Sequence, residues 1–137
     1  MSSPRVQSPA QIGATFRAAL DGFDGGSRPL ILGHFDADGL SATAILARAL
    51  ARTNRPADIR IMGKGENPWS PALRADLEAG RPGGLIVTDL GVQGGGILPG
   101  LPTVLIDHHV PRGTPGDAAV ISGNGWVPEP TSSLLAW

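Results

Sequence analysis

Residues 30–39 read Leu-Ile-Leu-Gly-His-Phe-Asp-Ala-Asp-Gly. The apolar residues that open this segment predict a short strand buried on both faces, as in a parallel sheet. Residues 40–52 are rich in Ala and Leu and contain neither Gly nor Pro, which predicts a helix. A buried strand followed by a helix indicates an α/β fold.

The same alternation continues on both sides of this segment. Apolar runs predict further strands, and helical spacing predicts further helices. The strands are expected at 58–62, 85–87, 103–106 and 118–121, and the helices at 10–23, 71–79 and 131–137. We therefore expect a mostly parallel, Rossmann-like sheet flanked by helices, with ligands bound at the carboxyl ends of the strands. Residues 1–9 show no periodic pattern and are expected to be a flexible start.

Composition excludes several classes of protein. The chain has 137 residues, which suits one domain or part of one, and it contains no Cys, which excludes disulfides, a thiol nucleophile and thiolate metal sites. Its net charge of -1 gives no strong overall attraction to nucleic acid or anionic lipid, although a local basic groove remains compatible with it. No apolar stretch approaches the roughly 20 residues of a membrane span, and we expect a cytoplasmic protein.

Acidic and imidazole side chains follow three of the predicted strands, and all three His residues of the chain are among them. At one edge of a parallel sheet these carboxylates would repel one another, and metal ions relieve such repulsion. Carboxylate and imidazole ligands without thiolate suit Mn²⁺ or Mg²⁺, and this many ligands suits two ions about 3.5–4 Å apart. The residues are His34, Asp36 and Asp38 after the first strand, Asp89 after the third, and Asp107, His108 and His109 after the fourth.

Each motif taken alone has a simpler interpretation. Asp-Ala-Asp-Gly is compatible with a turn, and Asp38 with a helix cap. Asp89 alone is compatible with an ordinary polar residue at the end of a strand, and the adjacent His108 and His109 with a solvated turn. The occurrence of all three motifs at strand ends favours the metal site.

The three motifs resemble those of the DHH phosphoesterase family, also called the DDH domain. Residues 34–39 resemble its first motif, residues 87–91 its second, and Asp-His-His at 107–109 the triplet that names the family. The resemblance covers residues 29–137 and is closest to the RecJ-like branch of single-strand exonucleases. It identifies residues 10–137 as the N-terminal part of such a domain.

The resemblance implies a ligand set for two Mn²⁺ ions, with Mg²⁺ as the alternative. His34 and Asp36 would bind the first ion, Asp38 and His108 the second, and Asp89 would bridge the two.

The resemblance also implies roles around the substrate. His109 would face the substrate phosphate, and Asp107 would orient the imidazoles. Lys64 and Arg112 are weaker candidates for phosphate contacts, because each is equally compatible with a solvated loop residue.

The activity implied is Mn²⁺-dependent hydrolysis of phosphodiester bonds in single-stranded DNA or RNA or in short oligonucleotides. Two alternatives stay open. The first is a hydrolase of a small substrate, a cyclic dinucleotide or pyrophosphate. The second is a metal-binding domain without catalysis.

Two family features have no counterpart in this sequence. One is a fourth Asp motif downstream of the triplet, where the chain offers only Asp117 and Glu129; the other is a C-terminal substrate-binding domain. The helix predicted at 131–137 also lacks a terminating residue. We expect the coding region, or a close homologue, to continue past Trp137, and the 137-residue chain to bind Mn²⁺ weakly with little activity.

Overall fold

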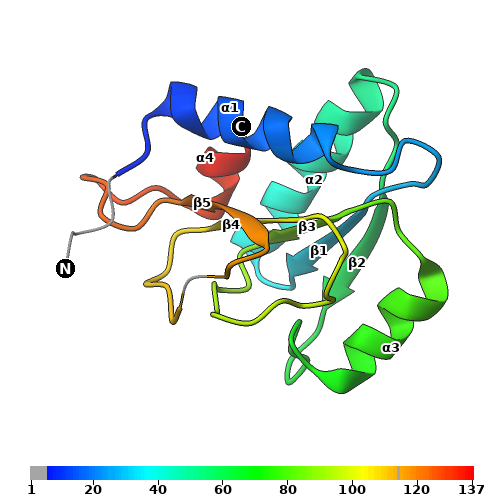
Figure 1. The fold of residues 1–137 in the computed structure, drawn as a ribbon. Helices are drawn as coiled ribbons and strands as arrows, with labels where there is room; N and C mark the ends of the chain where they lie inside the picture. Colours follow the sequence, from blue (N-terminus) through cyan, green and yellow to red (C-terminus); the bar gives the residue numbers. More distant parts are fainter. Residues whose placement is uncertain (1–5, 114) are drawn as a thin grey trace.

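Five parallel strands form a single sheet in the computed structural model, which describes residues 6–113 and 115–137 (Figure 1). The strand order is β2-β1-β3-β4-β5, and every neighbouring pair is parallel. The strands are β1 (Leu30–His34), β2 (Asp58–Met62), β3 (Leu85–Thr88), β4 (Thr103–Asp107) and β5 (Ala118–Ser122). The predicted α/β fold with a parallel sheet is confirmed.

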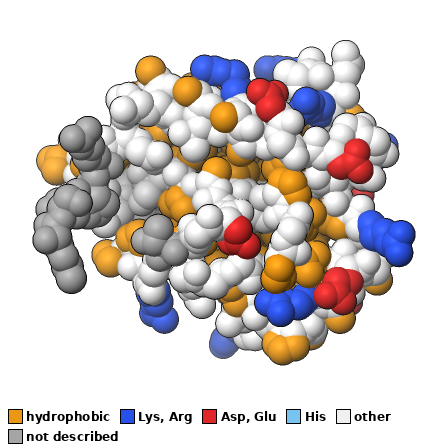
Figure 2. Space-filling model, in the orientation of Figure 1, with side chains coloured by type: hydrophobic (Ala, Val, Ile, Leu, Met, Phe, Trp, Pro, Cys, Tyr) orange, Lys and Arg blue, Asp and Glu red, His pale blue; other side chains and the backbone are white. Residues whose placement is uncertain are grey.

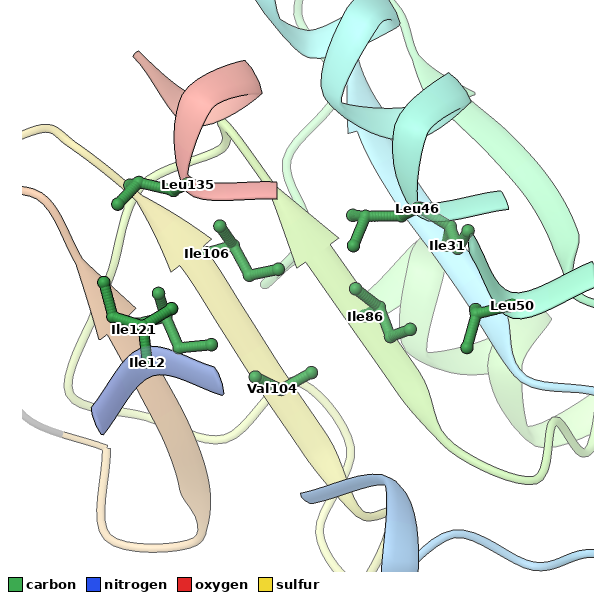
Figure 3. Packing of buried hydrophobic residues seen from close by; sticks show 9 residues of the cluster. All are labelled: Ile12, Ile31, Leu46, Leu50, Ile86, Val104, Ile106, Ile121 and Leu135. Atoms are coloured by element: carbon green, nitrogen blue, oxygen red, sulfur yellow. The ribbon is translucent and has the colours of Figure 1, made fainter. Parts of the chain in front are cut away.

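Helices cover both faces of the sheet. One face carries α1 (Pro9–Asp21), α2 (Ala37–Arg52) and α4 (Ser132–Ala136), and the other carries α3 (Pro71–Gly80) (Figure 1). Each face of the sheet has its own hydrophobic core. Figure 3 shows nine side chains of the core on the first face, which come from α1, α2, α4 and four strands. The core on the other face joins Leu73 and Leu77 of α3 to buried residues of the strands.

The central strands are buried along their whole length. Every residue of β3 and β4 is buried, which explains why both read as continuous apolar runs. By contrast, β2 lies at the edge of the sheet, and its Ile59 and Ile61 are exposed. The connection from β3 to β4 is a loop over residues 89–102, and its Val92 and Ile97 are buried against the α3 side of the sheet.

The start of α2 differs from the prediction. The helix begins at Ala37, three residues earlier than expected, because Asp36 is its N-cap and accepts a hydrogen bond from the Gly39 N–H at 2.8 Å. The alternative that Asp38 caps this helix is therefore wrong. Asp38 instead lies inside the first helical turn.

The predicted flexible start is only partly described. Residues 1–5 lie outside the described residues. Gln7 is held on β5, because its amide donates to the Val120 carbonyl at 3.2 Å and accepts from the Ser122 N–H at 3.1 Å. Ser8 then caps α1, so the helix begins at Pro9.

On the face drawn in Figure 2, acidic and basic side chains are interspersed, in line with the net charge of -1. Among the residues that the structure describes, no helix combines the length and the apolar character needed to span a bilayer.

Candidate metal centre

The polar residues that follow β1, β3 and β4 meet at the carboxyl edge of the sheet. The register pairs Thr88 with Gly33 on one side and with Ile106 on the other, so the residues that follow these positions are neighbours. The chain runs outward from β1 to β2 in one direction and from β3 to β5 in the other. A crevice opens at such a reversal of strand order, and ligands bind there.

Close approach of α2 to β1 creates the first part of this site. A Cβ added at Gly39 would collide with the His34 carbonyl oxygen, so only glycine allows the first turn of α2 to sit this close to the end of β1. This contact holds Asp36 beside His34 and fixes the helical turn that carries Asp38.

The first group of ligand atoms comes from His34, Asp36 and Asp89. One ligand atom from each residue lies within 4.8 Å of the others. The His34 Nδ1 is 3.0 Å from Asp36 Oδ2 and 3.5 Å from Asp89 Oδ2. This is the set predicted for the first ion.

The second group contains Asp89, His108 and His109, again within 4.8 Å of one another. The His108 Nε2 lies 3.3 Å from Asp89 Oδ1 and 3.5 Å from Asp38 Oδ2. Asp89 therefore belongs to both groups, with one oxygen toward each. Asp38 is in neither group among the described residues, although its Oδ2 faces His108.

Two buried atoms of the first group lack hydrogen-bond partners in the described part of the chain. They are the His34 Nδ1, whose contact with Asp36 lacks hydrogen-bond geometry, and the Asp89 Oδ2. Buried polar atoms without partners are costly and rare in native proteins. A divalent cation accepts electron pairs from both atoms, so the residues present fit a metal ion.

The backbone at Asp89 is also unusual. Its φ of 63° lies in the left-handed region, which Asp tolerates better than most residues but at some cost. Strained positions of this kind cluster at functional sites. Here the conformation follows directly after β3, where Asp89 reaches both ligand groups.

Burial raises the pKa of Asp89 to about 6, and the neighbouring Asp36 and Asp38 carboxyl groups act in the same direction. Burial also disfavours the charge of Asp36, but the hydrogen bond from Gly39, with smaller contributions from Asp89 and His34, holds the pKa of Asp36 below its usual range. Of these two carboxyl groups, Asp89 therefore holds a proton more readily than Asp36. Bound cations would replace that proton.

We expect Mn²⁺ affinity to rise with pH through about 6. Between pH 3.8 and about 6, Asp89 is protonated in the folded, metal-free chain but ionised in the unfolded chain. The stability that this protonation contributes is full below pH 3.8 and is lost as pH rises through about 6. Since Mn²⁺ requires the ionised carboxylate, affinity should rise about tenfold per pH unit below that value. Calorimetry in two buffers of different ionisation enthalpy measures both the affinity and the proton released. An affinity independent of pH from about 5 to 7 contradicts this assignment.

His109 is oriented by Asp107, which is 1% exposed. The Asp107 Oδ1 lies 2.8 Å from the His109 Nδ1, and its Oδ2 accepts a hydrogen bond from the His109 backbone N–H at 3.0 Å. Burial opposes the charged imidazole, but the hydrogen bond and charge of Asp107 outweigh it and raise the pKa of His109. The Nε2 is the ring nitrogen left for a ligand.

His108 has a different partner from the one expected. Its Nδ1 lies 3.1 Å from Glu129 Oε1. The resemblance implied that Asp107 orients both imidazoles; the described contacts join Asp107 to His109 and Glu129 to His108. Sequence reasoning had considered Glu129 only as a substitute ligand, because nothing local links it to a residue 21 positions earlier.

The beginning of α4 is the feature that sequence reasoning missed. The Asp38 carboxylate accepts hydrogen bonds from the Ser132 and Ser133 backbone N–H groups at 3.0 and 2.8 Å and from the Ser133 Oγ at 2.6 Å. The Ser132 Oγ donates to Asp89 Oδ1 at 3.0 Å. The sequence predicted a helix at 131–137, but not which residues the beginning of that helix contacts.

A cavity of about 760 Å³ adjoins the metal centre. Its lining includes His34, Asp89 and His109, together with the weaker candidates Lys64 and Arg112. Phe35 also lines it; this side chain is 46% exposed, and its ring centroid lies 4.7 Å from that of His34. The structure therefore brings both predicted cationic residues to the same cavity as the metal centre.

Solved structures share this fold. The crystal structure of exonuclease RecJ bound to manganese matches 98% of this chain with a TM-score of 0.69 and 23% identity. This chain has the fold of one part of exonuclease RecJ. The structure of RecJ in complex with Mn²⁺ from Thermus thermophilus matches 96% of the chain with a TM-score of 0.68 and 24% identity. The resemblance to the RecJ-like branch is thus confirmed at the level of the fold.

The chain covers 38% of the first RecJ chain and 20% of the second. No protein-family model matches the sequence, and a search of curated proteins found no relative.

Proposed function

We propose that this chain is the metal-binding part of a Mn²⁺-dependent phosphoesterase that hydrolyses phosphodiester bonds, with single-stranded nucleic acid or short oligonucleotides as substrate. The observation that carries the proposal is the double role of Asp89. Its two oxygens face two ligand groups on neighbouring strand ends, and the oxygen toward His34 is buried without a hydrogen-bond partner in the described part of the chain. A carboxylate shared in this way suits a two-metal phosphoryl-transfer site.

The ligand set favours Mn²⁺ or Mg²⁺, because it contains carboxylate oxygens and imidazole nitrogens and no thiolate. His34, Asp36 and Asp89 would hold the first ion, and Asp89, His108 and Asp38 the second. When bound, two divalent ions would polarise the phosphate and lower the pKa of the attacking water.

His109 is the group of this chain best placed to act on the substrate. Asp107 holds its Nδ1 and raises its pKa, which favours the protonated imidazole on approach of an anionic phosphate. The Nε2–H would donate to a phosphate oxygen as negative charge accumulates there. Asp107 would keep the ring from rotating and stabilise its positive charge.

The cavity beside the centre supports a substrate larger than an isolated phosphate. Its volume of about 760 Å³ lies in the range of sites for small organic ligands. Lys64 and Arg112 supply positive charge for phosphates, and the exposed ring of Phe35 supplies an apolar surface beside them. Aromatic rings in such positions favour stacked bases.

A second candidate, metal binding without catalysis, is favoured by one observation. Glu129, one of the two acidic residues downstream of the triplet, contacts the outer nitrogen of His108 and does not enter either ligand group. The second ion would then gain no further ligand from this acidic residue beyond Asp89, Asp38 and His108.

Incubation of the chain with Mn²⁺ and three substrates separates these functions. The substrates are 5′-phosphorylated single-stranded DNA, a dinucleotide and pyrophosphate. Mn²⁺-dependent release of nucleotides supports the proposal. Hydrolysis of pyrophosphate alone supports the small-substrate alternative, and Mn²⁺ binding with no hydrolysis supports the metal-binding domain.

Removal of the cationic residues should weaken substrate binding. We expect Lys64→Ala with Arg112→Ala to raise KM for the DNA roughly tenfold with kcat little changed, because each loses a charge-assisted hydrogen bond to phosphate. Arg28→Ala is the matched control, since Arg28 precedes β1 at the opposite edge of the sheet. Steady-state kinetics of the variants measure the effect; an unchanged KM would mean that both residues are merely solvated.

A further inference from the structure

The beginning of α4 contacts two of the carboxylates in the metal centre, although it lies more than 90 residues from Asp38 in the chain. The helix is anchored on the core by Leu135, and it packs against α2 and β4. Ser132 is fully buried, with 0% exposure, at the point of contact. This arrangement therefore places hydroxyl and N–H donors inside the site from an element that supplies no ligand.

Asp38 has most of its hydrogen-bonding capacity taken by α4. A carboxylate offers about four acceptor positions, two on each oxygen. The Oδ1 accepts from the Ser133 N–H and Oγ, and the Oδ2 accepts from the Ser132 N–H. One position is left on Oδ2, the oxygen that lies 3.5 Å from the His108 Nε2. Asp38 is thereby restricted to a single-oxygen contact on the side of the second ion.

Asp89 is held in the same way. Its Oδ1 accepts the hydrogen bond from the Ser132 Oγ and faces His108, whereas its Oδ2 accepts none from the described residues and faces the group around His34. With one oxygen fixed, the carboxylate cannot rotate to give both oxygens to one ion. Neither serine donates a hydrogen bond to His34 or Asp36 within the described chain.

We propose that Ser132 and Ser133 are positioning residues that orient Asp89 and Asp38 for the second metal ion. The inference rests on the proposed two-metal function. Without a cation, neighbouring carboxylates repel one another, and the donors of α4 hold them in the binding arrangement. Groups that orient ligands in this way typically change metal affinity about 10–100-fold.

The test compares Ser132→Ala and Ser133→Ala with Thr131→Ala. Thr131 caps α4 by accepting a hydrogen bond from the Leu134 N–H at 3.1 Å. Its replacement therefore weakens the helix start without removing a donor to Asp38 or Asp89. Ser133→Thr keeps the hydroxyl and serves as the conservative variant. Each variant is titrated with Mn²⁺ by calorimetry, and its electron paramagnetic resonance spectrum is recorded.

We expect each Ser→Ala variant to bind the second ion about 10–100-fold more weakly, with the first ion retained. The spectrum should change from that of an exchange-coupled Mn²⁺ pair to that of a single ion. Thr131→Ala and Ser133→Thr should keep the pair. Ser133 is partly exposed, so Ser133→Ala decides the matter if Ser132→Ala does not fold.

Two results overturn the inference alone: wild-type affinity for both ions in the Ser→Ala variants, or an equal loss in Thr131→Ala. A wild-type chain that never binds a second ion overturns the two-metal function and the inference with it.

Discussion

Asp89→Asn is expected to abolish most of the stabilisation that Mn²⁺ gives to this chain. Ligands that bind only the folded state raise its melting temperature, so wild-type protein should melt higher as Mn²⁺ is added. Asp89 belongs to both ligand groups, and the amide has lost one of the two charged oxygens. The variant should therefore lose affinity for both ions at once. Differential scanning calorimetry with and without Mn²⁺ measures the loss.

In metal-free wild type near neutral pH, the ionised Asp89 is repelled by the nearby carboxylates of Asp36 and Asp38. Asn removes that repulsion, so the metal-free variant should be no less stable than wild type. Asp117→Asn is the control, since Asp117 precedes β5 at the other edge of the sheet and should not change the Mn²⁺ response. An unchanged Mn²⁺ response in Asp89→Asn contradicts the assignment of a shared ligand.

His109→Ala should separate chemistry from metal binding. In a longer form that carries a substrate-binding domain, we expect kcat on a phosphodiester to fall about 10²–10³-fold, the usual cost of removing a donor to the developing negative charge. The number of Mn²⁺ ions bound should stay the same, because His109 is assigned to the substrate. His108→Ala should instead lose one ion, since the His108 Nε2 lies between Asp38 and Asp89.

Two measurements on each variant distinguish the roles of the two imidazoles: the number of Mn²⁺ ions bound, from calorimetry, and kcat, from steady-state kinetics. The His109 ring also lies within 4.8 Å of the ligand atoms of Asp89 and His108, so the reverse outcome has a clear structural meaning. If His109→Ala loses an ion while His108→Ala keeps both, the roles of the two residues are exchanged.

The sequence predicted the parts of the fold that depend on short-range pattern. Continuous apolar runs identified β3 and β4 because both strands are buried on both faces. Polar residues directly after the strands predicted which side chains gather at the carboxyl edge, since parallel strands bring their carboxyl ends to one edge. A helix was also predicted at 131–137, and the structure has α4 at Ser132–Ala136 with Thr131 as its N-cap.

The contacts between distant segments could not be predicted in this way. The hydrogen bonds from Ser133 to Asp38 join residues 95 positions apart, and that from Ser132 to Asp89 spans 43. They depend on how α4 packs against α2, which no local pattern encodes. The pairing of His108 with Glu129 was missed for the same reason.

We propose that the carboxyl edge of this sheet binds two divalent ions that share Asp89. Anomalous diffraction from crystals of the chain grown with Mn²⁺ locates such ions. We expect two manganese peaks about 3.5–4 Å apart, one beside His34 and Asp36, the other beside His108, with an oxygen of Asp89 bound to each. A single peak, or two peaks that do not share Asp89, would contradict it.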